Sequence, residues 1–198
     1  MRYNKYNDPK AKEPQKVKTI YIILSRSETM VSHLIGIFTS APYTHVSIAF
    51  EESLCPMYSF ARLGTLPLPG GIKLEYTDKG YYKDHGHIPC ALYSLNVPEE
   101  VYFKARRIAE SMMAEHDRYT YNVMGLFLCK LNIAMSRPYH YFCSEFVSNV
   151  LERSHAVKLP KHPSLMRPSD YMNLPGVNLV FKGRMHELAS QCAVERVS

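Results

Sequence analysis

The hydrophobic positions in the first half of the chain fall into short segments with the spacing of β-strands. Residues 18–25 are almost continuously apolar, and residues 44–50 alternate between polar and apolar side chains, which predicts two strands. A helix is predicted over 28–38, with Ser27 as its cap. Further short strands, separated by loops rich in proline and glycine, are predicted over 57–62, 72–76 and 90–95.

The second half of the chain has helical spacing instead. Residues 98–116 form the clearest helix, because a proline and two glutamates occupy the first turn and apolar residues recur along one face. Two more helices, a turn and a last strand are predicted over 121–131, 143–153, 169–173 and 177–181. A strand-rich half followed by a helix-rich half predicts an α+β fold, with an antiparallel sheet packed against a helical layer.

Composition and charge exclude several classes of protein. The 198 residues include 24 Lys and Arg against 18 Asp and Glu, for a net charge of +6, and much of the excess lies in the first 18 residues. We interpret residues 1–17 as a flexible basic tail and residues 18–198 as a single domain, since no break in composition divides them. No basic cluster falls on a predicted folded element, so nucleic-acid binding is not expected.

Targeting segments, disulfides and metals are not expected either. No stretch approaches the ~20 apolar residues of a membrane span, and the N-terminus lacks the apolar core of a signal peptide. We therefore expect a cytoplasmic protein without an integral membrane segment. The five cysteines include no CxxC pair, which argues against a disulfide framework or a zinc ribbon. The loop with Asp84, His85 and His87 lacks a later ligand pair, so neither a metal nor another cofactor is expected.

Two residues stand out as candidates for covalent chemistry. Cys143 is the first residue of a predicted helix, where the unpaired N–H groups and the helix dipole favour a thiolate and can stabilise an oxyanion. His45 begins a predicted strand, on the same face as the small Ser47 and Ala49, and is a possible base. Taken separately, each is more often an ordinary core residue. Paired with each other, a cysteine at a helix start and a histidine on a strand would form a workable nucleophile and base.

An ordered set of motifs resembles the permuted branch of the NlpC/P60 superfamily, a papain-like group that includes YiiX-like proteins of bacteria. In that branch the histidine strand precedes the cysteine helix, as His45 precedes Cys143 here. The resemblance covers about residues 18–183 and implies a circularly permuted papain-like fold, with Cys143 and His45 catalytic. The matching segments are 44–48 (THVSI), 57–60 (MYSF), 70–72 (GGI), 121–125 (YNVMG), 142–147 (FCSEFV) and 167–170 (RPSD).

This chain departs from the family pattern in the residue that would orient the imidazole. The family places a polar residue on the strand after the histidine strand, where this chain offers Ser59. Ser59 or a backbone carbonyl is the expected partner of the ring, and Glu75 is a more distant alternative. By its match to the family, Tyr121 is expected to line the substrate pocket. We also assign Tyr58, Tyr43 and Ser144 to substrate binding.

These residues predict a thiol-dependent hydrolase, of cysteine peptidase or amidase type, acting through an acyl-enzyme on a peptide or acyl-amide substrate. An acyltransferase would use the same thioester chemistry, but it needs an apolar surface or an anchor to reach lipid. A binding module that keeps the fold without turnover is the third alternative, and the weak orienting position is its main support. The acceptor separates the two enzymes, and the reactivity of Cys143 separates both from the binding module.

Overall fold

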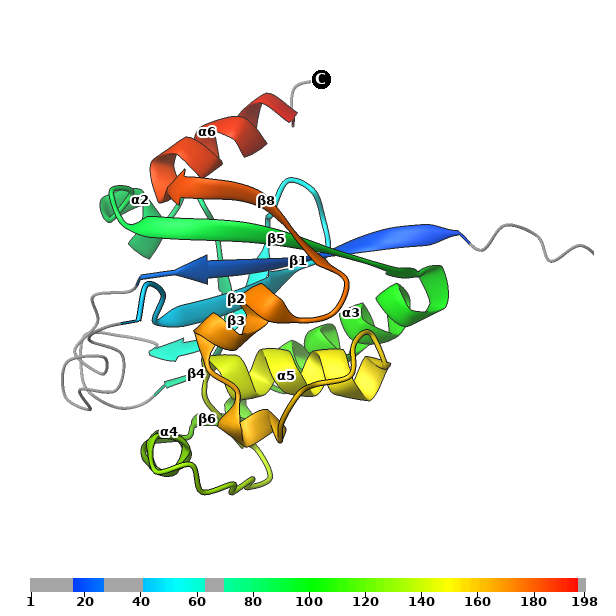
Figure 1. Ribbon diagram of the computed structural model, residues 1–198. Coiled ribbons are helices and arrows are strands. Elements are labelled where there is room, and N and C mark those ends of the chain that lie inside the picture. Colours follow the sequence, from blue (N-terminus) through cyan, green and yellow to red (C-terminus); the bar gives the residue numbers. More distant parts are fainter. Residues whose placement is uncertain (1–15, 27–40, 63–69, 196–198) are drawn as a thin grey trace, which may run out of the picture.

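The fold is built on one antiparallel sheet of six strands, in the order β4-β3-β2-β1-β5-β8 (Figure 1). The structure is a computed structural model, and it describes residues 16–26, 41–62 and 70–195. The predicted helix over 28–38 lies outside these residues, as does the predicted tail up to residue 15. The strands are β1 (Val17–Ser25), β2 (His45–Ala49), β3 (Met57–Arg62), β4 (Gly70–Glu75), β5 (Pro89–Pro98) and β8 (Val177–Arg184).

The helices and the short elements occupy the connections between these strands. The α-helices are α2 (Tyr81–Asp84), α3 (Glu99–Ala114), α4 (Val123–Lys130), α5 (Cys143–Ser154) and α6 (Met185–Glu195). The 3₁₀ helices are η1 (His116–Arg118), η2 (Pro163–Leu165) and η3 (Pro168–Asn173). A second, two-stranded sheet joins β6 (Thr120–Tyr121) to β7 (His140–Tyr141) in parallel. In the part of the chain that is described, no helix has the length and apolarity needed to cross a membrane.

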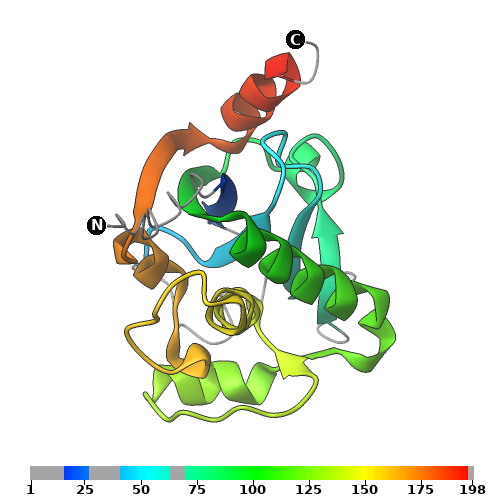
Figure 2. The same ribbon diagram turned by 90° about the vertical axis from the view of Figure 1, so that its right-hand side faces the viewer.

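The main hydrophobic core lies between the sheet and the pair α3 and α5 (Figure 1). Val46 and Ile48 of β2 are fully buried there, against Phe146 and Val147 of α5. Burying side chains of this size stabilises the fold by about 1.5–3 kcal/mol each relative to leaving them in water. Figure 2, in which α5 is seen end-on, shows α4 on the side of α5 away from the sheet.

A second core lies on the opposite face of the sheet. Ala49 of β2 and Leu92 of β5 are buried there with Met185 and Leu188 of α6. The sheet is therefore covered by helices on both faces rather than by a single helical layer. Residue alternation along β2 explains this arrangement, because His45, Ser47 and Ala49 face one side while Val46 and Ile48 face the other.

The α+β class, the antiparallel sheet and the principal predicted strands and helices are confirmed, with small shifts at their ends. Strand β5 continues to Pro98, because Val97 and Pro98 still pair with Lys18 and Val17 of β1. Helix α6 was not predicted. Its buried residues Met185, Leu188 and Cys192 do recur at helical spacing, and this is the signal that identifies it.

Candidate active site

Cys143 is the first residue of α5, as the sequence predicts. Phe142 precedes it in an extended conformation, and its backbone N–H donates to the side chain of Glu145 in the first helical turn. Cys143 is 6% exposed. The N–H groups of the first turn have no partner within the helix, so this end of α5 favours negative charge beside the sulfur.

His45 is the first residue of β2 and is paired with Ser25 of β1. On the other side of β2, the register to β3 joins Ile48 to Tyr58 and Ala49 to Met57. Among the described residues this pairing stops short of His45, so the sheet is open at that end of β2. The side chain of Cys143 of α5 is close enough to the imidazole of His45 to be one of the groups that raise its pKa. The structure thus brings together the two residues that the sequence predicts as nucleophile and base.

Glu75, the last residue of β4, contacts the same ring. Its Oε2 lies 3.1 Å from Nε2 of His45 and accepts a hydrogen bond of 2.6 Å from Ser47 Oγ. The Tyr82 hydroxyl of α2 donates to the same oxygen at 3.4 Å. The other oxygen, Oε1, lies 3.6 Å from the Lys73 ammonium. Because Glu75 engages Nε2, the remaining ring nitrogen, Nδ1, is the one available to the sulfur of Cys143.

His45 and Glu75 form a buried ion pair. Burial by itself lowers the pKa of His45, but the Glu75 carboxylate and the hydrogen bonds to Cys143 and Glu75 outweigh it and raise this pKa from 6.5 to about 10. Burial by itself raises the pKa of Glu75, but the charge of His45 lowers it to about 2, helped by Lys73 and Ser47. At neutral pH the ring is therefore an imidazolium and its partner a carboxylate.

Tyr82 completes the surroundings of the carboxylate. Burial and the nearby charge of Glu75 raise the pKa of its phenol well above 10, so the hydroxyl stays a donor. The hydroxyls of Tyr82 and Ser25 lie 3.1 Å apart, which ties α2 to the end of β1. Glu75 thus has hydrogen-bond donors from two other elements, and these limit the positions its carboxylate can take.

The expectation that Ser59 orients the imidazole is corrected by this geometry. Ser59 lies on β3, as predicted, but its hydroxyl is fully buried and has no hydrogen-bond partner within the described structure. Glu75, the more distant alternative, takes the place beside the ring. It reaches His45 from β4, two strands away in the sheet, where its carboxylate also accepts from Ser47 of β2, and the sequence does not reveal that approach.

The four residues predicted to bind substrate lie in different parts of the structure. Tyr121 is half-buried and packs against the small cluster that contains Phe142, directly before Cys143. Tyr43 is buried in the main core, and Tyr58 packs edge-on against Phe50. The Ser144 hydroxyl donates to the Met166 carbonyl at 2.6 Å, so this side chain holds the following loop. The assignment of these residues to substrate binding stays a prediction.

A buried carboxyl group joins the start of α5 to α4. Glu145 is fully buried, and accepts hydrogen bonds at 3.3 Å from Asn122 Nδ2 and from Ser136 Oγ. Asn122 is also the cap of α4, since its Oδ1 accepts from the Gly125 N–H at 2.8 Å. Burial raises the pKa of Glu145 to about 7, although the hydrogen bonds from Asn122, Ser136 and Phe142 oppose the rise.

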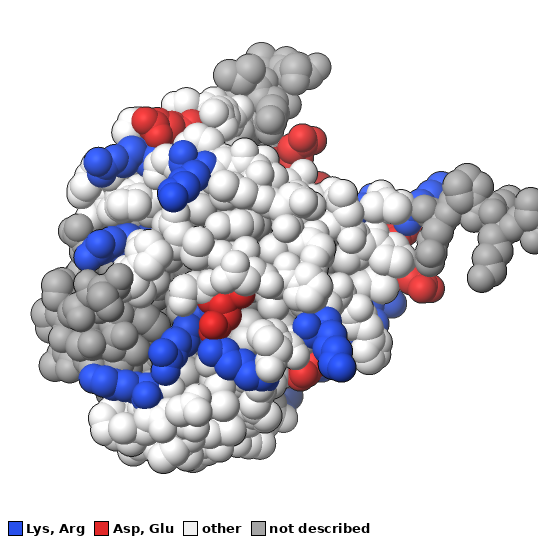
Figure 3. All heavy atoms as spheres, in the orientation of Figure 1, with Lys and Arg blue, Asp and Glu red and all other residues white. Residues whose placement is uncertain are grey.

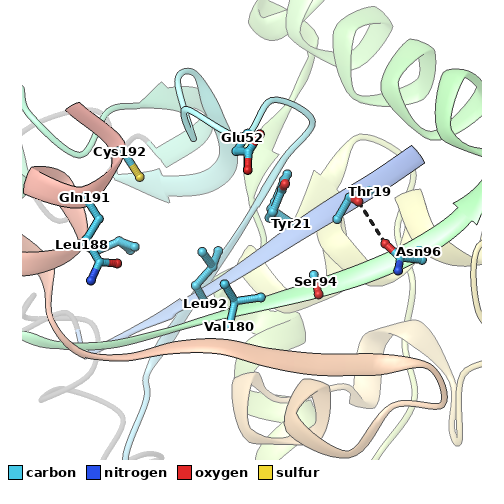
Figure 4. Close-up of a pocket in the computed structure, with 10 residues that line it drawn as sticks. All are labelled: Thr19, Tyr21, Glu52, Leu92, Ser94, Asn96, Val180, Leu188, Gln191 and Cys192. Atoms are coloured by element: carbon cyan, nitrogen blue, oxygen red, sulfur yellow. Dashed lines mark hydrogen bonds between the residues drawn. The ribbon is translucent and has the colours of Figure 1, made fainter. Parts of the chain in front are cut away.

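A separate cavity of about 260 Å³ lies between the sheet and α6 (Figure 4). Thr19 and Tyr21 of β1, Ser94 of β5 and Cys192 of α6 are among the side chains around it. None of its lining residues contacts the ion pair of His45 and Glu75, and Cys143 is not among them. The cavity therefore does not belong to the cysteine–histidine site.

Comparison with known proteins does not assign the chain to a family. No family model matches the chain, and no match is found among the curated proteins or among the solved structures.

Proposed function

We propose that the protein is a thiol-dependent hydrolase in which Cys143 attacks the carbonyl of a peptide or acyl-amide substrate. The observation that carries this proposal is that Cys143 and Glu75 both lie beside the imidazole of His45. The ring interacts with the side chain of Cys143 and pairs with the buried carboxylate. A cysteine at a helix start, an imidazole and an acidic partner are the components of a nucleophilic site.

The chemistry follows from the charge of the imidazole. In the reacting state a thiolate at Cys143 faces the imidazolium of His45, and its sulfur attacks the substrate carbonyl carbon to give a tetrahedral oxyanion. The N–H groups at the start of α5 stabilise that oxyanion. When the C–N bond breaks, His45 gives its proton to the leaving amine. Water, deprotonated by the now neutral His45, then attacks the thioester and releases the acid, while the proton on the ring restores the ion pair.

The proposal extends to the fold and the location of the protein. The histidine strand β2 precedes β3, β4 and β5, and the cysteine helix α5 follows them, which is the order of the permuted NlpC/P60 branch. Membership of that branch, and a cytoplasmic location, are part of what we propose. Glu75 on β4 would be a variation on the family pattern, in which the orienting residue lies one strand earlier.

The first test is the alkylation rate of each cysteine in the native protein, measured by peptide mass spectrometry from pH 5 to pH 9. Cys55 is more exposed than Cys143, while Cys90 and Cys129 are buried, so these cysteines serve as internal controls. We expect Cys143 to react faster than Cys55 at pH 6.5, and replacement of His45 by Ala to slow Cys143 by roughly tenfold. Equal rates at Cys143 with and without His45 would instead indicate a binding module.

A second measurement separates hydrolysis from acyl transfer. A panel of chromogenic peptide amides and acyl amides is supplied with and without a primary amine, and the products are resolved by mass spectrometry. We expect the free acid to dominate in both conditions, and to disappear in Cys143→Ser. An amide product that exceeds the acid at millimolar amine would identify an acyltransferase that uses the same residues.

A further inference from the structure

Helix α4 is apolar on all sides although only part of it is buried. Its sequence is VMGLFLCK, and its inner face places Leu126 and Cys129 against Phe142. A helix that is hydrophobic all round is normally enclosed by protein or by lipid. Here the outer face and the segment after it expose five large side chains: Val123 at 39%, Met124 at 56%, Phe127 at 49%, Leu131 at 53% and Ile133 at 50%. We call these five residues the apolar ridge.

The ridge is continuous because of helical spacing. Val123, Phe127 and Leu131 follow one another at intervals of four, so their side chains lie one above the other, and Met124 lies beside them. Leu131 caps the C-terminal end of the helix, and Ile133 donates its N–H to the Leu128 carbonyl in the chain that follows. Single exposed apolar residues are ordinary, but a contiguous exposed group marks an interaction surface.

Basic residues border the ridge on the chain that carries it. From Tyr119 to Ser144 the chain has no Asp or Glu, whereas Lys130 and Arg137 are exposed, and Arg118, just before this segment, is paired with Glu115. Arg167 adds a positive charge at the same place, since its guanidinium donates to the Cys129 carbonyl at 3.2 Å. Figure 3 shows Lys and Arg side chains, with a smaller number of Asp or Glu side chains among them, along the upper boundary of the uncharged lower part of the molecule. Such a border is complementary to an anionic surface.

We infer that the apolar ridge docks the protein reversibly on the surface of a lipid bilayer that contains anionic headgroups. An outward-facing helix with apolar side chains and a basic border lies in the boundary between headgroups and acyl chains, with the positive charges at the level of the phosphates. Docking of this kind needs no membrane-spanning helix. It also does not depend on the proposed hydrolase chemistry.

A second copy of the chain fits the ridge less well. Helix α4 has eight residues, which makes it about 12 Å long. A stable dimer needs about 800 Å² from each partner, and five half-exposed side chains on so short a helix supply only part of that area. A fluid bilayer sets no such requirement, because a few apolar side chains and several basic residues together give reversible binding.

The position of the ridge relates it to the cysteine helix. Asn122, the cap of α4, and Ser136, beyond the ridge, both donate to Glu145 of α5 at 3.3 Å. The two ends of the ridge-bearing segment are thus held to the first turn of the helix that begins at Cys143. Docking through the ridge brings that end of α5 close to the membrane surface.

The test is vesicle flotation with the full chain. Wild type is compared with the double variant Met124→Ser/Phe127→Ser on vesicles of phosphatidylcholine, with and without phosphatidylglycerol. Leu179→Ser/Val180→Ser is the matched control, since these β8 residues are 54% and 56% exposed but lie outside the ridge. We expect recruitment to the anionic vesicles that weakens about tenfold in the ridge variant, a change of about 1.4 kcal/mol, and is unaltered in the control. Arg137→Ala should reduce binding to the anionic vesicles alone.

Several outcomes would overturn the inference. One is the absence of recruitment in wild type. Another is equal recruitment of wild type and the ridge variant, which would assign binding to the charges of the N-terminal residues that both proteins retain. If light scattering shows that wild type is a dimer and the ridge variant a monomer, the ridge would be the interface with a second copy of the chain. Cys143→Ser should bind vesicles as wild type does, so failure of the hydrolase proposal is seen separately from failure of this one. Circular dichroism checks that each variant is folded.

Discussion

Glu75 Oε2 lies 3.1 Å from His45 Nε2, although the two residues belong to strands β4 and β2, which have β3 between them in the sheet. Both groups are almost completely buried, at 9% and 8% exposure. A buried ion pair stabilises a fold only where hydrogen bonds and neighbouring charges offset the cost of removing each charge from water. Ser47, Lys73 and Tyr82 provide that compensation for the carboxylate.

Replacing Glu75 by Gln should lower activity far more than it lowers the amount of folded protein. The amide keeps the shape of the side chain but removes the charge that holds His45 protonated and in place. By comparison with the loss of the acidic member of other triads, we expect turnover to fall by about 10²–10⁴-fold. The measurement is kcat on the substrate identified in the screen, together with the alkylation rate of Cys143. Unchanged values of both would remove Glu75 from the site.

Replacing Ser59 by Ala should leave activity unchanged and should not destabilise the protein. The hydroxyl is buried without a partner, so the unfolded chain regains a hydrogen bond with water that the folded protein lacks. We expect the free energy of unfolding to stay the same or rise by up to about 1 kcal/mol. Urea denaturation and the activity assay check this. A loss of activity comparable to that of Glu75→Gln would restore Ser59 as the orienting residue.

The ion pair predicts a broad range of pH in which the protein is most stable. The pKa of Glu75 is lowered to about 2, so its contribution is complete above the unfolded value of about 4.5 and is lost as the pH falls towards 2. The pKa of His45 is raised to about 10, so its contribution is complete below about 6.5 and is lost as the pH rises towards 10. These are two aspects of one interaction and do not add.

The measurement is the free energy of unfolding against pH in wild type and in Glu75→Gln. The variant should lose the fall in stability between pH 6.5 and pH 10 that belongs to His45. A variant curve parallel to that of wild type across this range would show that the two groups are not paired in solution.

Because of Glu145, the free energy of unfolding should fall as the pH rises through the mildly acidic range, which is opposite to the effect of Glu75. Its pKa is raised from 4.5 to about 7, so between these values the folded protein binds more protons than the unfolded chain. Stability therefore decreases as the pH rises through this window, by an amount on the order of a few kcal/mol. Glu145→Gln should abolish the slope, as measured by urea denaturation at pH 5 and pH 6.5, below the range in which the contribution of His45 is lost. Wild type that is equally stable at both values, or the same slope in Glu145→Gln, would contradict a raised pKa.

The sequence predicts the framework of the fold because each main element carries its own local signal. Alternation along 44–50 and the apolar run at 18–25 are properties of strands, and Cys143 follows a polar loop where a helix begins. His45 and Cys143 could be paired before the structure was known, since each occupies a position that suits its chemistry.

Glu75 could not be assigned in the same way. It lies on a strand that is two positions from β2 in the sheet, so its approach to His45 depends on how the strands are assembled and not on the local sequence. The sequence predicts a helix over 121–131 and shows that it is apolar, but does not say whether its outer face is covered. Periodicity cannot separate a buried helix from an exposed apolar one, because it records which residues are apolar and not what covers them.

The order of these residues along the chain has a consequence for biosynthesis. Ser25, His45, Glu75 and Tyr82 all precede α3, so the acid–base half of the site is synthesised as one block within the first half of the sheet. Cys143 emerges from the ribosome much later, with the helix that completes the main core. The thiol can therefore meet its imidazole only after β5, α3 and α4, which separate the two halves of the site, have been synthesised.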